Sequence, residues 1–316
     1  MTRSTFLPLS RTLTVIFLLP ASCGLAGPTQ QPPDEVRTTV ALDSITVAPP
    51  APILIGPRAT QRLVVTGKHA DGRDRDWTRS AQFESQTRNV VTVDKSGVLR
   101  PVADGEGTVR VRAGSDKTVE IKVVVRNFAS QEPISFANHI VPLLTKASCN
   151  MGACHGAQHG KGGFKLSLFG GEPAADHSAI VKEAEGRRVV MSSPEESIVL
   201  LKPTLTTAHG GGKRLEVDGP AYNAIKSWLD QGGPAPSEQD PHVVRIEVFP
   251  RERLMEHGDQ QQMAVRAVYS NETVEDITSK ARLDTLNEGV ATVSPDGLIK
   301  AVNKGETAIM VRYLGQ

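Results

Sequence analysis

The chain repeats itself at a distance of 200 residues, and this repeat constrains its possible folds more than any other feature. Without a gap, Val90, Thr92, Val93 and Gly97 match Val290, Thr292, Val293 and Gly297. The following residues are also identical to the residue 200 positions further along the chain: Asp76, Thr78, Val102, Gly105, Glu106, Val111 and Arg112. The 316 residues therefore contain two copies of one module, separated by a segment that occurs once.

Within each copy, apolar and polar residues alternate in the way that predicts β-strands with one buried face. The alternating positions of the first copy include Val109, Val111, Val119, Ile121 and Val123. Turn sequences such as Lys95-Ser96-Gly97 and Pro295-Asp296-Gly297 separate the strands. Short strands at this cadence predict a β-sandwich for each copy, at residues 43–126 and 243–316.

Both copies have the spacing Val-x-Thr-Val-x-x-x-Gly followed by Val-x-x-Gly-Glu. In this spacing each copy resembles the bacterial immunoglobulin-like domain of group 2, which is common in cell-surface proteins. The resemblance implies either adhesion and ligand presentation or a rigid spacer, and we favour the spacer because a fold does not define a function. We expect Trp77 and Tyr269 to be core or edge residues rather than binding platforms.

The segment between the copies has a different sequence pattern. Glycine-rich loops and helical spacing replace the alternation, and five of the eight histidines lie here. The pattern predicts a first helix over residues 136–147, kinked at Pro142, and a last helix that begins with Asp218 as N-cap and ends at Gly232. We therefore expect a separate domain at residues 134–233.

The segment Cys149-Asn150-Met151-Gly152-Ala153-Cys154-His155 points most directly to chemistry. Covalent attachment of haem c requires two thiols, which add to the porphyrin vinyl groups, and an adjoining histidine, which binds the iron. The usual spacing is CxxCH, whereas this chain has two additional residues, which we expect a positive φ at Gly152 to accommodate. The alternatives are a Cys149–Cys154 disulfide and a zinc site made of both thiols, His155 and a distant histidine.

Several motifs of this segment together carry a second resemblance. Residues 149–156, 161–168, 194–203, 209–214 and 225–229 are similar to the cytochrome c-like domain of large planctomycete surface proteins, which lies beside group 2 immunoglobulin-like modules. The resemblance implies a multidomain α and β protein in which two Ig-like β-sandwiches flank a mainly α-helical, class I cytochrome c-like domain. Such proteins typically continue into longer regions, so we interpret the chain as an N-terminal portion or a short member.

Carried over to this chain, the resemblance implies that Cys149 and Cys154 form the thioethers to haem c and that His155 is the proximal iron ligand. Where relatives have a methionine before the last helix, this chain has a histidine. The distal candidates, in order, are His209, then Met191, then His159 or His177. Ligation by two histidines predicts a lower reduction potential than ligation by histidine and methionine.

The amino-terminal residues predict export. Arg3 and Arg11 precede an apolar run over residues 13–19 and small residues up to Ala26, which is typical of a secretory signal peptide over residues 1–26. A linker over residues 27–42 follows, and Cys23 is a fainter indication of a lipoprotein site. We expect the mature protein in the periplasm or at the cell surface, in the oxidising space where haem c is attached.

Charge and motif content narrow the function further. The 36 cationic and 35 acidic residues give a net charge of +1, so no basic field attracts nucleic acid. Lys161, Lys165, Lys213 and Arg214 form either the surroundings of a haem edge or a solvated face. The sequence has no nucleophile elbow, phosphate loop or paired-histidine metalloprotease motif, so we expect no enzyme activity.

Two hypotheses for the whole chain result. In the first, it is an exported electron carrier with one covalent haem presented between Ig-like modules. The haem exchanges electrons with an unidentified redox partner, and the Ig-like modules bind a cell-surface or envelope component. In the alternative, it is a structural or adhesive cell-envelope protein without haem, in which Cys149 and Cys154 form a disulfide.

Overall fold

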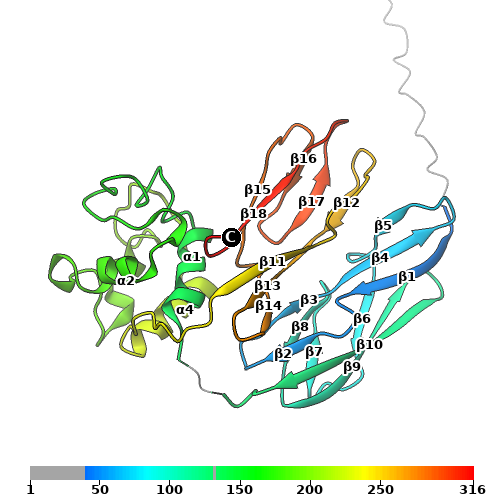
Figure 1. Ribbon diagram of the computed structural model, residues 1–316, viewed down its shortest axis with the longest axis horizontal. Helices are drawn as coiled ribbons and strands as arrows, with labels where there is room; N and C mark the ends of the chain where they lie inside the picture. The colour runs from blue at the N-terminus through cyan, green and yellow to red at the C-terminus, as the bar shows by residue number, and fades with distance from the viewer. Residues whose placement is uncertain (1–39, 131–132) are drawn as a thin grey trace, which may run out of the picture. The chain divides into compact units, whose positions relative to one another are not determined.

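The computed structural model describes residues 40–130 and 133–316. The signal peptide predicted at 1–26 lies outside these ranges, as does the predicted linker up to residue 39. Within them, the chain is mostly β-structure, with 18 strands arranged in six sheets. Figure 1 shows the strands of the two repeats and the helices of the middle segment.

The first repeat forms ten strands around one apolar core. Its sheets have the orders β2-β10-β9-β6, β1-β4-β5 and β3-β8-β7, and β2 is parallel to β10. The strands are β1 (Leu42–Ala48), β2 (Ile53–Ile55), β3 (Gln61–Arg62), β4 (Val64–His69), β5 (Asp74–Asp76), β6 (Gln82–Ser85), β7 (Val91–Val93), β8 (Val98–Pro101), β9 (Gly105–Ala113) and β10 (Lys117–Arg126).

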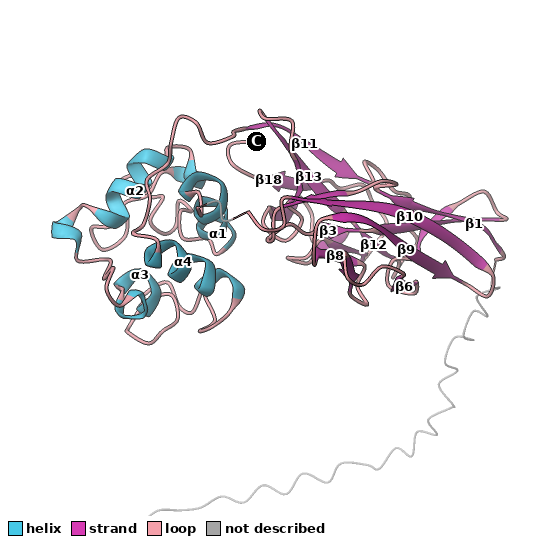
Figure 2. Ribbon diagram, turned by 90° about the horizontal axis from the view of Figure 1, so that it is seen from below, coloured by secondary structure: helices cyan, strands magenta, loops and turns pink. Residues whose placement is uncertain are grey.

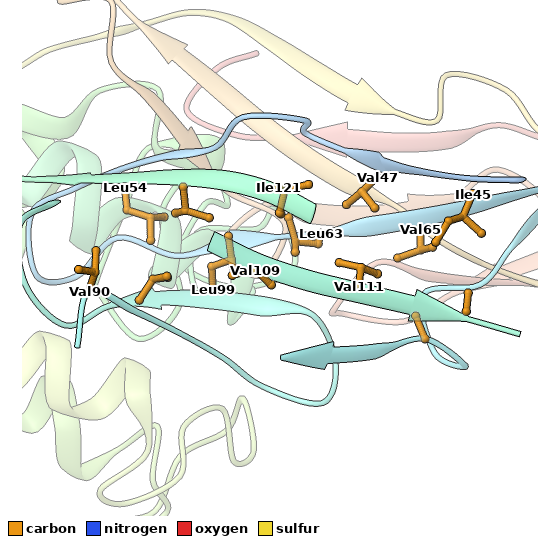
Figure 3. Packing of buried hydrophobic residues seen from close by; sticks show 14 of the residues in the cluster. Ile45, Val47, Leu54, Leu63, Val65, Val90, Leu99, Val109, Val111 and Ile121 are labelled. Atoms are coloured by element: carbon orange, nitrogen blue, oxygen red, sulfur yellow. The ribbon is translucent and has the colours of Figure 1, made fainter. Parts of the chain in front are cut away.

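Alternation along the longest strands builds this core. Val109 and Val111 of β9 and Ile121 of β10 are at most 3% exposed, whereas the residues between them are more accessible. Figure 3 shows these side chains gathered with Leu63 and Val65 of the facing layer. Because full burial of such a side chain stabilises a fold by about 1.5–3 kcal/mol, the alternation determines which face of each strand lies inside.

The second repeat reproduces local hydrogen bonds of the first at positions shifted by 200. The backbone N–H of Thr78 donates to Asp76 Oδ1 at 2.9 Å, and that of Thr278 donates to Asp276 Oδ1 at 2.8 Å. Its strands are β11 (Val243–Phe249), β12 (Gln260–Gln262), β13 (Ala264–Tyr269), β14 (Val274–Asp276), β15 (Arg282–Thr285), β16 (Ala291–Val293), β17 (Leu298–Ala301) and β18 (Ile309–Arg312). Its assignment to the same Ig-like family stays a prediction.

The two repeats also exchange hydrogen bonds with each other. Asp76 Oδ2 accepts the backbone N–H of Gln262 at 2.7 Å, and Asp276 Oδ2 accepts the backbone N–H of Arg62. Donors and acceptors are related by the same shift of 200, so the contact is reciprocal. Burial raises the pKa of both carboxyl groups, although each accepts several hydrogen bonds.

The segment between the repeats consists of short helices joined by turns, as the cyan and pink stretches of Figure 2 show. Phe136 and Trp228 pack together at its centre, with ring centroids 5.1 Å apart. The helical elements are the π-helix η1 (Phe136–Ile140), the α-helices α1 (Val141–Lys146), α2 (Pro173–Val181), α3 (Ile198–Leu201) and α4 (Pro220–Asp230), and the 3-10 turns η2 (Leu168–Gly170), η3 (Ala184–Gly186) and η4 (Pro194–Glu196).

The predicted fold class is wrong on this point, because the chain is mostly β and contains no mainly α-helical, class I cytochrome c-like domain within the described residues. The four α-helices of the middle segment have 6, 9, 4 and 11 residues, and turns and loops separate them. Gly160, Gly162 and Gly163 all adopt positive φ, so the chain after the cysteine motif does not form a helix there.

The two predicted helices exist with changed boundaries. The first is divided into η1 and α1, and Pro142 lies in the first turn of α1, where its missing N–H costs no hydrogen bond. The last is α4, whose N-cap is Gly219 rather than Asp218. Asp218 instead has φ of 58°, and its carbonyl accepts a hydrogen bond from Asn223.

Candidate ligand-binding site

The middle segment contains a cavity of about 430 Å³. Residues of α1, α2, α3 and α4 and of the intervening loops form its walls. The volume lies in the range of about 300–1,000 Å³ that is usual for small-molecule and cofactor sites. The lining is mainly apolar and includes Leu143, Leu144, Phe164, Ile180, Leu215 and Ile225.

The cysteine motif reaches this cavity because α1 ends just before it. Ser148 adopts φ of 65°, and the N–H of Cys149 donates back to the carbonyl of Leu144 at 2.8 Å, which closes the helix. The N–H of His155 then donates to the carbonyl of Cys149 at 3.0 Å, so the motif forms a closed loop. As a result Cys149, Cys154 and His155 all line the cavity.

The glycine that shapes this loop is not the predicted one. Gly152 does not adopt a positive φ, so the positive φ expected there is wrong. Gly156 has the structural role, because a Cβ there would lie 2.2 Å from the backbone oxygen of Asn150. The Asn150 side chain is buried and donates to Thr145 Oγ1 at 2.8 Å, which ties the loop to α1.

Both cysteines of the motif are free thiols in the structure. Burial raises the pKa of the Cys149 thiol to about 11, so that this group is neutral at physiological pH. The disulfide of the alternative hypothesis is therefore not formed in this conformation.

His155 and His209 form a pair of nearly parallel rings in the cavity lining. Their ring centroids are 6.4 Å apart, and their planes differ by 13°. His155 Nδ1 bonds to the carbonyl of Phe164 at 2.9 Å and His209 Nδ1 to that of Gly212 at 2.8 Å, which makes Nδ1 the protonated nitrogen and Nε2 the atom with a lone pair. Burial lowers the pKa of His155, as does the neighbouring His209, so its neutral form is favoured.

Gly211 leaves room for this arrangement. A Cβ on Gly211 would lie 2.8 Å from Cε1 of His209, too close for the ring to keep its position. At the adjacent Gly210, a Cβ would meet nothing closer than a lysine carbon at 4.0 Å.

The other predicted distal candidates lie elsewhere. Met191 packs against Gly233 and does not line the cavity. His177 is buried, bonds to the carbonyl of Gly233 at 2.8 Å and contacts Trp228 edge-on, which indicates a structural role. His159 is exposed and outside the lining.

Two lining residues were not predicted from the sequence. Phe164 packs against His155 with ring centroids 4.5 Å apart, and the guanidinium of Arg188 lies 4.6 Å from the centre of the Phe164 ring. Arg188 is buried and donates to the carbonyl of Ala179 at 2.7 Å. In the sequence, Arg188 directly precedes the apolar pair Val189-Val190, but this position does not indicate that its side chain lines a cavity.

The zinc alternative lacks a ligand set. Across residues 40–130 and 133–316, no group of three or more His, Cys, Asp or Glu side chains is placed to hold a metal ion. Two histidines, by contrast, suffice where a macrocycle supplies the other ligands of a metal.

Comparisons with known proteins identify the family of the first repeat. Residues 41–123 match the bacterial Ig-like domain (group 2), which confirms the family predicted for the first repeat. Ice-binding protein 1 of Shewanella frigidimarina (strain NCIMB 400) is 22% identical over 277 residues, which are 86% of this chain and 27% of that protein. The chain thus spans about a quarter of the length of this curated relative.

Among solved structures, the chain is similar to domains 5–6 of the S-layer protein SbsC, at 13% identity and a TM-score of 0.32, covering 86% of this chain and 91% of that one. It is also similar to an intimin mutant of EHEC O157:H7, at 14% identity and a TM-score of 0.22, over 34% of this chain and 59% of that one. Among the described residues, no helix has the length and apolar character needed to cross a membrane.

Proposed function

We propose that this chain is an exported cell-envelope protein in which Ig-like domains hold a ligand-binding middle segment, and that the ligand is one covalently attached haem. The group 2 Ig-like domain at residues 41–123 and the similarity to an ice-binding protein support the envelope assignment. Export itself rests on the amino-terminal sequence. The haem assignment rests on the cavity and its side chains and on no likeness to a cytochrome fold.

The observation that carries the haem proposal is the pair of parallel imidazoles in an apolar cavity. Imidazole nitrogens bind metal ions at about 2.0–2.1 Å, so two rings on opposite sides of one metal have centres about 6 Å apart. The 6.4 Å between His155 and His209 fits this requirement. The hydrogen bonds of both Nδ1 atoms to carbonyls fit it as well, because metal-binding histidines usually donate their other N–H in this way.

Cys149 and Cys154 supply the covalent attachment in this proposal. Each thiol would add across one vinyl group, so that a C–S bond forms and the thiol hydrogen goes to the neighbouring carbon. His155 and His209 would hold the iron. The bound group supplies reversible transfer of single electrons, and the apolar walls keep water from it.

The test is production of the chain with the haem-attachment machinery, followed by an absorbance scan. We expect a Soret band that survives extraction with acid acetone and a low-spin spectrum. His209→Ala should change that spectrum to high-spin, while His159→Ala, in the same segment but outside the cavity, should not. Protein without a Soret band would remove the haem proposal, and an unchanged His209→Ala spectrum would remove His209 as a ligand.

A second pair of variants tests the position of His209 rather than its presence. Gly211→Ala should displace the ring and produce a partly high-spin spectrum, because its Cβ overlaps the imidazole. Gly210→Ala is the matched control, since a Cβ there has room. Identical spectra for the two variants would contradict ligation by His209.

The second candidate function is a structural or adhesive envelope protein without haem. The comparisons support it more directly than the first, since they concern an Ig-like domain and an ice-binding relative. It predicts an intact mass without a macrocycle. Its predicted Cys149–Cys154 disulfide would also leave neither of these thiols free for alkylation after export.

A further inference from the structure

We infer that the ligand of the cavity carries at least two carboxylates and that Lys161, Arg187 and Lys202 bind them at the cavity mouth. The inference rests on the proposed haem site and extends it, because it assigns residues to the charged edge of the ligand rather than to its metal.

The first observation is that the charges around the cavity have one sign. Five cationic residues line it, whereas none of its described lining residues is Asp or Glu. The whole chain has 36 cationic and 35 acidic residues, so composition alone does not produce a wall of one sign. A mouth of this kind attracts an anion and disfavours a cationic ligand.

The second observation separates the cations that already have partners from those that do not. Arg188 donates to backbone carbonyls and stacks on a phenylalanine, and Arg214 Nε donates to a carbonyl at 2.8 Å. The side chains of Lys161, Arg187 and Lys202 make no hydrogen bond or ion pair with any residue in the described ranges. All three are exposed, so their charges stay hydrated until a ligand arrives.

The third observation places two of these charges next to the imidazole pair. Lys161 Cε comes within 4.0 Å of the Cβ position of Gly210, which follows His209 directly. Lys202 lines the same cavity as His155 and His209. A planar apolar ligand bound in this cavity would therefore have both lysines among its surroundings, and flexible carboxyalkyl substituents could reach their ammonium groups.

The experiment uses metal-free protoporphyrin IX, a fluorescent planar ring with two carboxylates that needs neither iron ligation nor thioether formation. The chain is produced without haem attachment and titrated with this porphyrin at low salt. We expect the double variant Lys161→Gln/Lys202→Gln to bind about five- to tenfold more weakly than the original chain, from the loss of two exposed ion pairs. The matched control Lys165→Gln/Lys182→Gln removes the same charge outside the cavity lining and should change the affinity less than twofold.

Substitution of the ligand provides an independent arm. The dimethyl ester of the same porphyrin has no charge, so its affinity should be equal for the original chain and both double variants. Equal binding of the free acid by all three proteins would overturn the inference while leaving the haem proposal intact. Absence of porphyrin binding by the original chain would also overturn it. Conversely, a chain that shows the lysine dependence but attaches no haem in the absorbance test would retain the carboxylate site and lose the haem function.

Discussion

Gly156 shows how strongly a single missing side chain determines the shape of the ligand site. Its Cβ would overlap the backbone oxygen of Asn150, so Gly156→Ala forces the loop to move. We expect this variant to lower the free energy of unfolding by about 1–3 kcal/mol. Gly152→Ala is the matched control in the same loop, because its Cβ would meet nothing closer than 3.9 Å, and its effect should be within about 0.5 kcal/mol. Urea unfolding of both variants measures the difference, and equal stabilities would contradict the assigned role.

At the scale of residues, the sequence indicates which side chains can bind a ligand but not which side chains surround them. Cys149, Cys154, His155 and His209 are recognisable by type and spacing, and the structure places all four in the lining of one cavity. Their binding of haem stays a prediction. Phe164 and Arg188 could not be identified in this way, because their role arises from stacking between residues 24 positions apart.

At the scale of elements, the start of η1 makes stability depend on pH. His139 Nδ1 accepts the backbone N–H of Ser135 at 2.9 Å, which requires a neutral ring. Burial lowers the pKa of His139 from 6.5 to about 4. The unfolded chain therefore binds the proton more tightly, so this contribution is complete above pH 6.5 and is lost as the pH falls from 6.5 toward 4, by up to about 3 kcal/mol.

The test compares the pH dependence of unfolding between variants, because other groups titrate in the same range. His139→Gln should flatten the loss of stability between pH 6.5 and 4 relative to the original chain. His159→Gln, which removes an exposed histidine from the same segment, should leave the curve parallel. Parallel curves for both variants would contradict a neutral, buried His139.

Elements with a clear period were predictable, and irregular ones were not. The alternation of apolar and polar residues around Val109, Val111 and Ile121 predicts the strands β9 and β10. The boundary of α4 was missed by one position, since Asp218 is a good N-cap by type but adopts a left-handed conformation here. The 3-10 turns and glycine loops around the cavity have no period from which to predict them.

At the scale of the whole molecule, the reciprocal contact of Asp76 and Asp276 predicts coupled stability of the two repeats. Asp76→Ala and Asp276→Ala should each cost about 1.5–3 kcal/mol, because each leaves backbone donors without a charged partner. In the double variant the second substitution should cost less than it does alone, by at least about 0.5 kcal/mol, because both act on one contact.

Asp94 provides the control for this cycle. It bonds within its own turn, to Ser96 and Val98, and to Arg100 of the same repeat. Asp94→Ala combined with Asp276→Ala should therefore be additive in urea unfolding. Additivity of Asp76→Ala with Asp276→Ala would show that the two repeats unfold independently.

The repeat itself was readable from the sequence, since identical residues at a fixed distance indicate identical local structure. The helical content of the middle segment was overestimated, because a mainly helical domain was predicted from two helices and a cysteine motif. Between those helices the chain is held by side-chain contacts such as Asp176 with Ser167, whose Oγ–Oδ2 distance is 2.7 Å. Such contacts substitute for helical hydrogen bonds and are invisible to periodicity.

Across the joint between the repeats, each carboxylate binds a peptide N–H group, which every residue except proline offers. One side-chain hydrogen bond is added on one side only, from Gln61 Nε2 to Asp276 Oδ2 at 3.3 Å. Arg62 and Gln262 differ in their side chains, yet both donate the same main-chain hydrogen. A joint of this type tolerates substitution at its two donor positions, so modules whose sequences diverge can keep the same contact.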